Sequence, residues 1–290
     1  MSSAFVRAYR LGSVDGAYLS SMSRIRAAAA LFLALAMGCG ASRNYHEVSG
    51  PRHAGMPLSP RAPHARGDTI RVVTFNLEYG ERVDSALAMF AADSGLSDAD
   101  VVLLQEMDSS STDRVATALG MAYVFYPAIY HPRAEQDFGN AILSRWPIVS
   151  DAKLILPHAS RYARTNRTAT AATLNIRDVH VRVYSTHLGT VLDIGPNARR
   201  DQLRAIIADA DTFPRVILGG DMNSTNVGNV AREMGYAWPT EHGPRTMQIA
   251  RVDHIFLKGL AVPASGFTGT VADNRQSSDH KAVWARAVIR

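Results

Sequence analysis

The chain has 290 residues, of which 47% are hydrophobic and 20% are charged, a balance that excludes collagen-like, coiled-coil and wholly disordered proteins. A single cysteine excludes a disulfide framework and a cysteine-rich zinc site. The net charge of +5 comes from the N-terminal part, because residues 1–66 carry 8 Lys and Arg against 2 Asp and Glu, whereas residues 67–290 carry 23 against 24. The basic excess is therefore no sign that the folded part binds nucleic acid.

Residues 1–38 are predicted to be a signal peptide. Two arginines in residues 23–26 precede an apolar run over residues 27–37, which is long enough for a signal-peptide core and too short to span a bilayer. Met22 stands where such a peptide usually starts. Small residues around Cys39 are typical of a bacterial lipoprotein site, at which this cysteine would be lipidated. Ala36-Met37 fits that site poorly, so simple cleavage stays open, and both routes predict export to the cell envelope or beyond.

Residues 39–67 are predicted to be a tether without regular structure. Pro51, Pro57, Pro60 and Pro63 stand among Gly, Ser, His and Arg, with almost no apolar periodicity, and such a composition favours an extended linker. The folded part is then expected over residues 68–290.

Strands and helices alternate along that part. Apolar runs and alternation predict strands at 70–75, 100–105, 141–143, 171–176, 179–186, 216–218, 252–257 and 282–289. Helical spacing predicts helices at 82–90, 113–119 and 197–210. No internal repeat or second boundary is visible, so one α/β domain is expected.

Polar side chains stand at or near the ends of six of these segments, namely Asn76, Glu106, His187, Asp221 with Asn223, Asp253, and Asp279-His280. Taken singly, each is more often a turn or capping residue than a catalytic one. Together they can converge on one rim of a sheet, where an active site can be held rigidly.

Seven blocks of the sequence resemble, in order, those of the endonuclease/exonuclease/phosphatase superfamily, which has the deoxyribonuclease I-like fold. The blocks cover residues 72–80, 100–106, 139–148, 183–189, 217–224, 251–257 and 277–284, and include Val-Val-Leu-Leu-Gln-Glu, Ile-Leu-Gly-Gly-Asp-Met-Asn and Ser-Ser-Asp-His. The resemblance implies a four-layered α/β/β/α sandwich of two packed mixed sheets flanked by helices. It also implies hydrolysis of phosphate esters with a divalent cation, usually Mg²⁺, with Mn²⁺ as an alternative.

Site roles follow from that resemblance together with the chemistry of a phosphodiester. Mg²⁺ prefers carboxylates, waters and phosphate oxygens, so the metal site is expected at Glu106, Asn76 and Asp279. We expect His280 to be the general base, oriented by Asp253. Contacts to the substrate phosphate are expected from Arg167, Tyr126 and Asn140.

Three further residues are expected beside the phosphate. Asp221 and Asn223 would reach it from one side of an extended segment, with Asp221 positioning water or assisting the leaving group. His187 would bind or protonate the phosphoryl group. Which carboxylate activates the water, and how many metal ions bind, stay open.

The substrate stays open between nucleic acid and a phospholipid or sugar-phosphate ester. A membrane contact is expected through a lipidated Cys39, and a monomer is expected. The alternative is a binding lipoprotein that keeps the fold without catalysis. We disfavour that alternative because the whole set of expected catalytic and metal residues is present.

Overall fold

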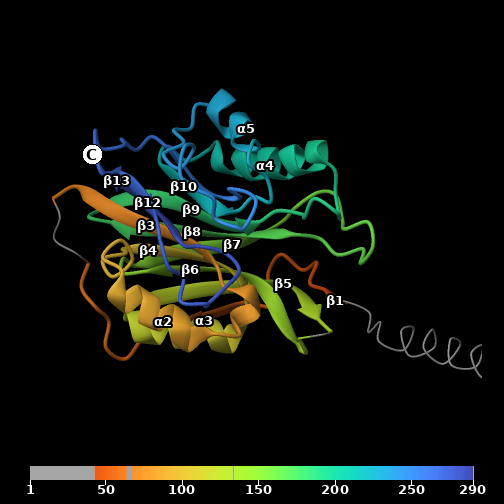
Figure 1. The fold of residues 1–290 in the computed structure, drawn as a ribbon, viewed down its shortest axis with the longest axis horizontal. Helices are drawn as coiled ribbons and strands as arrows, with labels where there is room; N and C mark the ends of the chain where they lie inside the picture. The colour runs from red at the N-terminus through yellow and green to blue at the C-terminus, as the bar shows by residue number, and fades with distance from the viewer. Residues whose placement is uncertain (1–42, 64–66, 133, 290) are drawn as a thin grey trace, which may run out of the picture. The chain divides into compact units, whose positions relative to one another are not determined.

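Helices cover the outer faces of two packed β-sheets in the computed structural model, which describes residues 43–63, 67–132 and 134–289 (Figure 1). The predicted signal peptide and Cys39 lie outside these residues. Among the residues described, no helix is long and apolar enough to cross a bilayer.

The first sheet has eight strands in the described chain: β1 (Arg43–Asn44), β2 (His53–Gly55), β3 (Thr69–Asn76), β4 (Val101–Met107), β5 (Ala122–His131), β6 (Gln136–Ser144), β12 (Thr268–Thr270) and β13 (Val283–Val288). Its order is β1-β5-β6-β4-β3-β13-β12, with β2 also paired to β5. β3 and β4 are parallel, and their neighbours β13 and β6 are antiparallel to them, so this sheet is mixed.

The second sheet contains β7 (Ile148–Ile155), β8 (Thr168–Ile176), β9 (Val179–His187), β10 (Val216–Asp221) and β11 (Asp253–Lys258). Its order is β11-β10-β9-β8-β7, and only the central β9–β10 pair is parallel. The helices are α2 (Val83–Ala92), α3 (Ser109–Leu119), α4 (Pro196–Ala210) and α5 (Gly228–Glu233), with a 3₁₀ turn at Glu78–Gly80. Figure 1 shows α2 and α3 against the first sheet and α4 and α5 against the second, which confirms the expected four layers.

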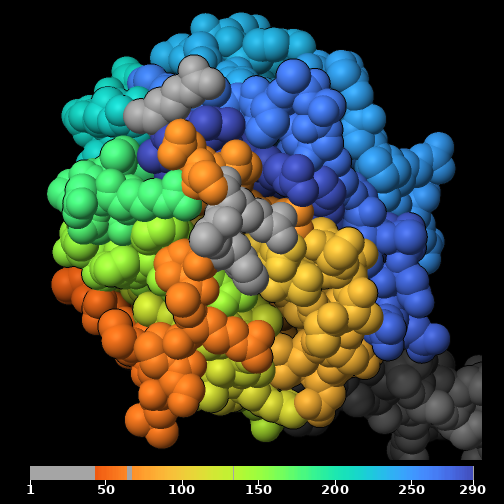
Figure 2. Space-filling view, turned by 90° about the vertical axis from the view of Figure 1, so that its left-hand side faces the viewer, coloured from red at the N-terminus to blue at the C-terminus, as the bar shows by residue number. Residues whose placement is uncertain are grey.

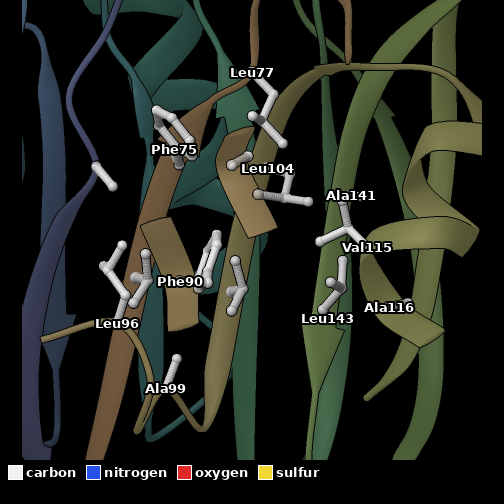
Figure 3. Packing of buried hydrophobic residues seen from close by; sticks show 14 of the residues in the cluster. Phe75, Leu77, Phe90, Leu96, Ala99, Leu104, Val115, Ala116, Ala141 and Leu143 are labelled. Carbon is white, nitrogen blue, oxygen red and sulfur yellow. The ribbon is translucent and has the colours of Figure 1, made fainter. Parts of the chain in front are cut away.

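Three large hydrophobic clusters fill the spaces between these layers. In β4, Val102 and Leu104 face the cluster under α2 and α3 (Figure 3), whereas Val101 and Leu103 face the cluster between the sheets. This arrangement explains the unbroken apolar run of β4, because both faces of the strand are buried. Leu203 and Ile206 of α4 pack on the outer face of the second sheet.

Two helices differ in detail from the sequence prediction. α3 begins four residues before the predicted start, because the side chain of Asp108 caps it by accepting hydrogen bonds from the backbone amides of Ser110 (2.8 Å) and Ser111 (3.0 Å). It ends at Gly120, whose positive φ of 66° closes the last turn. α5 was not predicted, since its six residues are too few to show a helical period.

The segment 43–63 was predicted to be a tether, and the structure differs. β1 and β2 pair with β5 in antiparallel register. Arg52 forms a two-pronged ion pair with Asp151 of β7, with nitrogen–oxygen distances of 2.6 and 2.7 Å. The ammonium of the buried Lys153 donates to the carbonyls of Tyr45 (3.0 Å) and Gly50. Figure 2 shows the red and orange residues of this segment lying against the surface of the domain. Backbone pairing and ion pairs, which apolar periodicity does not reveal, hold it there.

Two glycines allow β10 to pass close to its neighbours. Gly220 has a φ of 149°, and a Cβ there would lie 1.8 Å from the carbonyl oxygen of Thr186 on β9. A Cβ on Gly219 would lie 2.8 Å from Leu103 of the other sheet. The Gly-Gly pair therefore lets the end of β10, which carries Asp221, lie close to both β9 and the first sheet.

Candidate active site

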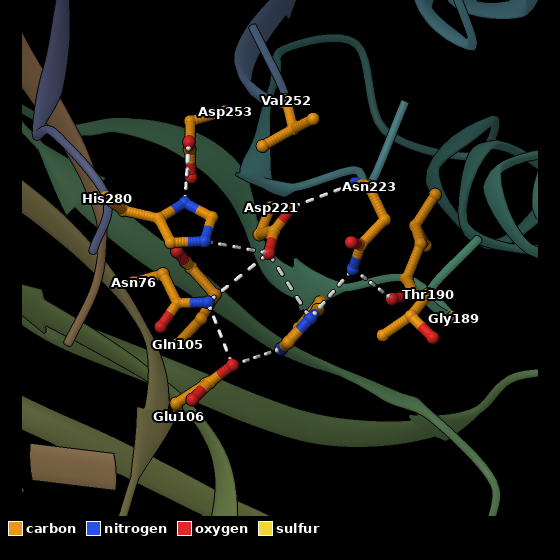
Figure 4. Close-up of polar contacts among 12 residues, drawn as sticks. Asn76, Gln105, Glu106, Gly189, Thr190, Asp221, Asn223, Val252, Asp253 and His280 are labelled. Carbon is orange, nitrogen blue, oxygen red and sulfur yellow. Dashed lines mark hydrogen bonds and ion pairs between the residues drawn. The ribbon is translucent and has the colours of Figure 1, made fainter. Parts of the chain in front are cut away.

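A pocket of about 370 Å³ opens where the ends of several strands meet. It is lined by one residue each from β4, β6, β9 and β10, by three residues of β5, by residues just before β13, and by surrounding loops. The charged and imidazole side chains among them are Glu106, His131, Arg167, His187, Asp193, Asp221, Asp279 and His280. Figure 4 shows the central side chains converging from strands that are far apart in sequence. The structure thus brings together most of the residues that the sequence singled out.

His280 is held between two carboxylates. Its Nδ1 lies 2.8 Å from Asp253 Oδ2 and its Nε2 lies 3.7 Å from Asp221 Oδ2 (Figure 4). Burial would lower the pKa of His280, but the charges of Asp253 and Asp221 outweigh it and raise this pKa to about 10. The fully buried Asp253 fixes the ring orientation, because Nδ1–H donates to it and Nε2 is left facing the pocket.

Two loop hydroxyls hold this pair in place. Thr246 Oγ1 accepts from the backbone amide of Asp253 (3.3 Å). Ser278 Oγ donates to the carbonyl of Asn76 (2.7 Å) and accepts from the amide of His280 (3.0 Å). Ser278 belongs to the Ser-Ser-Asp-His block of the sequence, whereas Thr246 stands in none of the seven blocks and at no predicted strand end.

Asp221 lies at the centre of the site. Burial, and then the negative charge of Asp253, raise the pKa of Asp221 to about 7. Asp221 Oδ1 accepts a hydrogen bond from the backbone amide of Asn223 (2.8 Å). Asn223 has a positive φ of 47°, which turns the chain so that Asn223 Nδ2 lies 2.9 Å from His187 Nε2. The predicted proximity of Asp221 and Asn223 is therefore present, although it arises from a turn rather than an extended segment.

His187 lies between charges of both signs. Arg167 Nη1 is 3.2 Å from its Nδ1, and Asp221 Oδ2 is 3.2 Å from its Nε2. Burial, together with the positive charges of Arg167 and His280, holds the pKa of His187 well below its ordinary value of 6.5. A neutral His187 suits binding of a phosphoryl group better than protonation of it.

A β-bulge aims Glu106 at the pocket. The pairing of β4 with β6 shifts between Gln105 and Met107, and the intervening Glu106 has a φ of 58°. Gln105 Nε2 donates to Ser185 of the other sheet (3.1 Å), whereas Met107 packs towards the helices. Glu106 is therefore the inserted residue, and its side chain is free to leave the plane of the sheet.

Asn76 joins two carboxylates at this point. Its Nδ2 donates to Glu106 Oε1 (3.0 Å) and to Asp221 Oδ2 (3.2 Å), and its Oδ1 accepts from the backbone amide of Glu78 (3.1 Å). Burial raises the pKa of Glu106, although the bond from Asn76 opposes this effect. The buried carboxylate of Asp221 and the partly buried carboxylate of Glu106 converge on one amide, and a cation would be strongly favoured at such a site.

Two of the residues that were predicted to contact phosphate do not line the pocket. The hydroxyl of Tyr126 donates to Asp151 (2.6 Å), and its ring packs between the sheets. Asn140 Nδ2 donates to the carbonyl of Thr168 (2.9 Å) and so links the two sheets. Neither residue lines the pocket, because both side chains of this β5–β6 pair point into the space between the sheets.

The loops that close the pocket were also missed. Ser160 and Asp193 line it, and Ser160 Oγ donates to Asp193 Oδ1 (2.9 Å), which links two loops that are far apart in sequence.

Phe138 lies under the guanidinium of Arg167, with 5.7 Å between the guanidinium carbon and the ring centre. Asp279 lies at the mouth, half exposed, with Oδ1 3.9 Å from His280 Nε2.

The donor set fits a hard divalent cation. Four carboxylates line the pocket, whereas Arg167 is the one arginine or lysine that lines it among the described residues. This excess of negative charge would repel an anionic ester unless a cation bound beside it in the pocket. The carboxylates of Glu106, Asp221 and Asp279 line the pocket. Deeper in the site, possible ligand atoms of Asp221, Asp253 and His280 lie within 4.8 Å of one another. Such oxygen-rich sites suit Mg²⁺ or Mn²⁺.

Comparison of sequences identifies one family. The model described as "Endonuclease/Exonuclease/phosphatase family" matches residues 73–280, a range that contains every pocket residue named above. No curated protein matches the sequence.

Solved structures share the fold at low identity. D. rerio TDP2 in complex with a single strand DNA product is 16% identical with a TM-score of 0.56, over 76% of this chain and 99% of that chain. Bacteroides thetaiotaomicron mannosyl-6-phosphatase is 18% identical with a TM-score of 0.55, over 76% and 100%. The catalytic domain of human Nocturnin, with bound sulfate, is 16% identical with a TM-score of 0.58, over 82% and 98%. These likenesses support the α/β/β/α fold.

Proposed function

The chain belongs to the endonuclease/exonuclease/phosphatase family and is a phosphoester hydrolase of that family, and we propose that it cleaves phosphodiesters with a divalent cation after export. The observation that carries this proposal is the buried His280–Asp253 pair, which lies beside Asp221 in the pocket. A hydrolase needs a base for water, positive charge for the phosphate and support for the leaving oxygen. The pocket offers residues for all three.

His280 would take the proton from the attacking water. Asp253 keeps Nδ1 protonated, so Nε2 is the nitrogen available to accept a proton. Asp221 lies 3.7 Å from that nitrogen and would position the water or assist the leaving oxygen.

Arg167, His187 and Asn223 would bind the phosphate oxygens. Arg167 supplies a permanent positive charge, while His187 and Asn223 are held together by the 2.9 Å contact between Asn223 Nδ2 and His187 Nε2. An incoming phosphate would compete for these donors without a rearrangement of the backbone.

Glu106 and Asp279 would hold the metal, with Asn76 fixing the carboxylate of Glu106 through its amide group. Mg²⁺ is the proposed ion and Mn²⁺ is a substitute. A bound divalent cation supplies positive charge to the phosphate and offsets the carboxylates that raise the pKa of His280.

The proposed substrates are nucleic acid or a phospholipid or sugar-phosphate ester. D. rerio TDP2 was solved with a DNA product, and the Bacteroides protein is a mannosyl-6-phosphatase, so relatives with this fold act on different phosphate esters. We further propose a monomer in the bacterial envelope, anchored through Cys39. This location rests on the leader-like residues 1–38.

A release assay tests the function. Residues 43–290 would be offered plasmid DNA, RNA, sphingomyelin, phosphoinositides and bis-p-nitrophenyl phosphate, each with Mg²⁺, Mn²⁺ or a chelator. We expect turnover of at least one substrate with metal and none with chelator. His280→Ala should lower kcat by about 10³-fold or more. Absence of turnover under every condition, or wild-type rates in His280→Ala, would refute the proposal.

Glu106→Gln tests the metal assignment separately. The variant should bind Mg²⁺ more weakly, measured by calorimetry and by the Mg²⁺ concentration that gives half-maximal rate. Glu81→Gln, which changes an exposed carboxylate, is the matched control. Unchanged Mg²⁺ affinity in Glu106→Gln would remove Glu106 from the ligand set.

A further inference from the structure

Several exposed apolar side chains stand on the loops that line the pocket. Three loops, which we call the rim loops, comprise residues 157–167, 188–195 and 242–250, and each contributes pocket-lining residues. Tyr162, Leu192 and Ile249 project from them with 75%, 81% and 85% of their surface exposed, and Val191 is also exposed. Side chains of this kind are costly to leave in water, and several of them on loops around one pocket favour an interaction surface there.

The rim loops are also basic. They contain four arginines against a single acidic residue, Asp193. Arg161, Arg164 and Arg245 are exposed, whereas Asp193 accepts hydrogen bonds from Ser160 (2.9 Å) and Thr190 (3.1 Å). This local positive charge contrasts with the near-neutral balance of residues 67–290, and so it favours an anionic partner.

The N-terminal segment enters the domain beside the same loops. Asn44 Nδ2 donates to the carbonyl of Arg164 (2.9 Å), and Asn44 Oδ1 accepts from the amide of Asn166 (2.9 Å). Figure 1 shows β1 and the loop after β7 on one side of the domain. Cys39 stands five positions before Asn44, so a lipid on that cysteine would hold this loop within about 18 Å of the bilayer.

We propose that the rim loops are a docking surface for an anionic phospholipid bilayer, which turns the pocket towards lipid phosphates. Apolar side chains flanked by arginines are the combination that inserts between headgroups while the arginines pair with anionic lipids. This docking deepens the proposed function by naming the surface on which the enzyme works. Only the hydrolysis of the lipid phosphate ester rests on that function. The docking itself requires no catalysis.

Vesicle flotation tests the docking without the lipid anchor. Residues 42–290 form one compact unit that contains all four hydrophobic clusters, so residues 43–290 can be studied alone. Binding would be measured to phosphatidylcholine vesicles with and without phosphatidylglycerol. We expect binding to the anionic vesicles and a loss of about tenfold in affinity for Leu192→Asp, because one inserted leucine is lost.

Matched variants separate the docking from other effects. Arg161→Glu should weaken binding to anionic vesicles, whereas Leu58→Asp, at a fully exposed leucine of the segment after β2, should leave it unchanged. All three variants should hydrolyse bis-p-nitrophenyl phosphate at the wild-type rate, since none lies in the catalytic set. Wild-type vesicle binding without any hydrolysis would refute the proposed function and leave the docking intact.

Three results would overturn the docking. These are no binding of the wild type to either kind of vesicle, equal loss of binding in Leu58→Asp, and a wild type that binds single-stranded DNA but no vesicles. Ultracentrifugation supplies a fourth, namely a dimer that Leu192→Asp dissociates, which would assign the rim loops to a second copy of the chain.

Discussion

A single buried carboxylate, Asp253, decides which nitrogen of His280 faces the pocket, and the proposed base role of His280 depends on it. In Asp253→Asn the amide can no longer accept the Nδ1 proton in the same way, so the wrong tautomer is favoured. We expect kcat to fall by about 10³- to 10⁴-fold with little change in KM. Steady-state kinetics on bis-p-nitrophenyl phosphate would measure this, with Asp211→Asn, an exposed carboxylate paired with Lys258, as control. A rate within a few-fold of wild type would show that Asp253 does not orient the base.

The raised pKa of His280 predicts how stability depends on pH in the absence of metal. The ordinary pKa of a histidine is about 6.5, and the pKa of His280 in the folded state is about 10. Between these two values His280 is protonated in the folded state and neutral in the unfolded state. This stabilisation is fully present below pH 6.5 and is lost as the pH rises towards 10. Urea unfolding with chelator present should therefore show a free energy of unfolding that falls over this range, by on the order of a few kcal/mol.

His280→Gln provides the control for that pH dependence. The variant has no proton to release, so its free energy of unfolding should change much less between pH 7 and pH 10. Asp221, whose pKa is about 7, still loses its proton at the lower edge of this window, and loss of the His280 charge raises its pKa further. The two profiles are therefore compared at the upper end of the range, close to pH 10. Parallel pH profiles for the wild type and the variant would show that the pH dependence does not come from His280.

At the scale of elements, the close approach of β9 and β10 depends on Gly220. An alanine there would meet the carbonyl of Thr186 and would have to adopt a φ of 149°, a region that L-residues avoid. We expect Gly220→Ala to lower the free energy of unfolding by about 3 kcal/mol or more and to lower activity by displacing Asp221. Gly195→Ala, where nothing lies within 4 Å of the new Cβ, should cost far less. Equal effects of the two substitutions would show that the strands can move apart.

The sequence predicted strands best where burial is uniform. The run in β4 and the alternation in β9 were clear, and both strands lie inside the molecule. β5 was missed because Pro127 interrupts its apolar run, and the structure accommodates this proline next to a register shift between Pro127 and Ile129. β7 was missed because Asp151 and Lys153 break its pattern, and their partners are residues of the segment 43–63 that only the folded chain brings near.

The site shows the same limit on what one sequence reveals. Residues at strand ends were predicted because a sheet carries its strand ends to a common edge, and Glu106, Asp221 and His280 do meet. Tyr126 and Asn140 lie outside the pocket lining, since which face of a strand points to the pocket depends on the bulges and register of its neighbours. Ser160, Thr190 and Asp193 were missed because loop residues come together only through contacts between distant loops.

At the scale of the whole molecule, the segment 43–63 belongs to the domain. Removing residues 43–66 would delete the Arg52–Asp151 pair and the partners of Lys153, and would expose the outer edge of β5. We expect residues 67–290 to unfold with a free energy lower by a few kcal/mol than residues 43–290, measured by urea titration. Arg52→Ala in the longer chain should show part of this loss. Equal stability of the two chains would mean that the segment only rests on the surface.

The position of β13 has a consequence for biosynthesis. This strand leaves the ribosome after every other strand described, yet it lies between β3 and β12 in the first sheet, and His280 directly precedes it. A chain in which β13 has not yet joined the sheet has an open slot beside β3, and His280 is not yet held against Asp253. Under the proposed function such a chain would be inert, and activity would arise only when this strand docks.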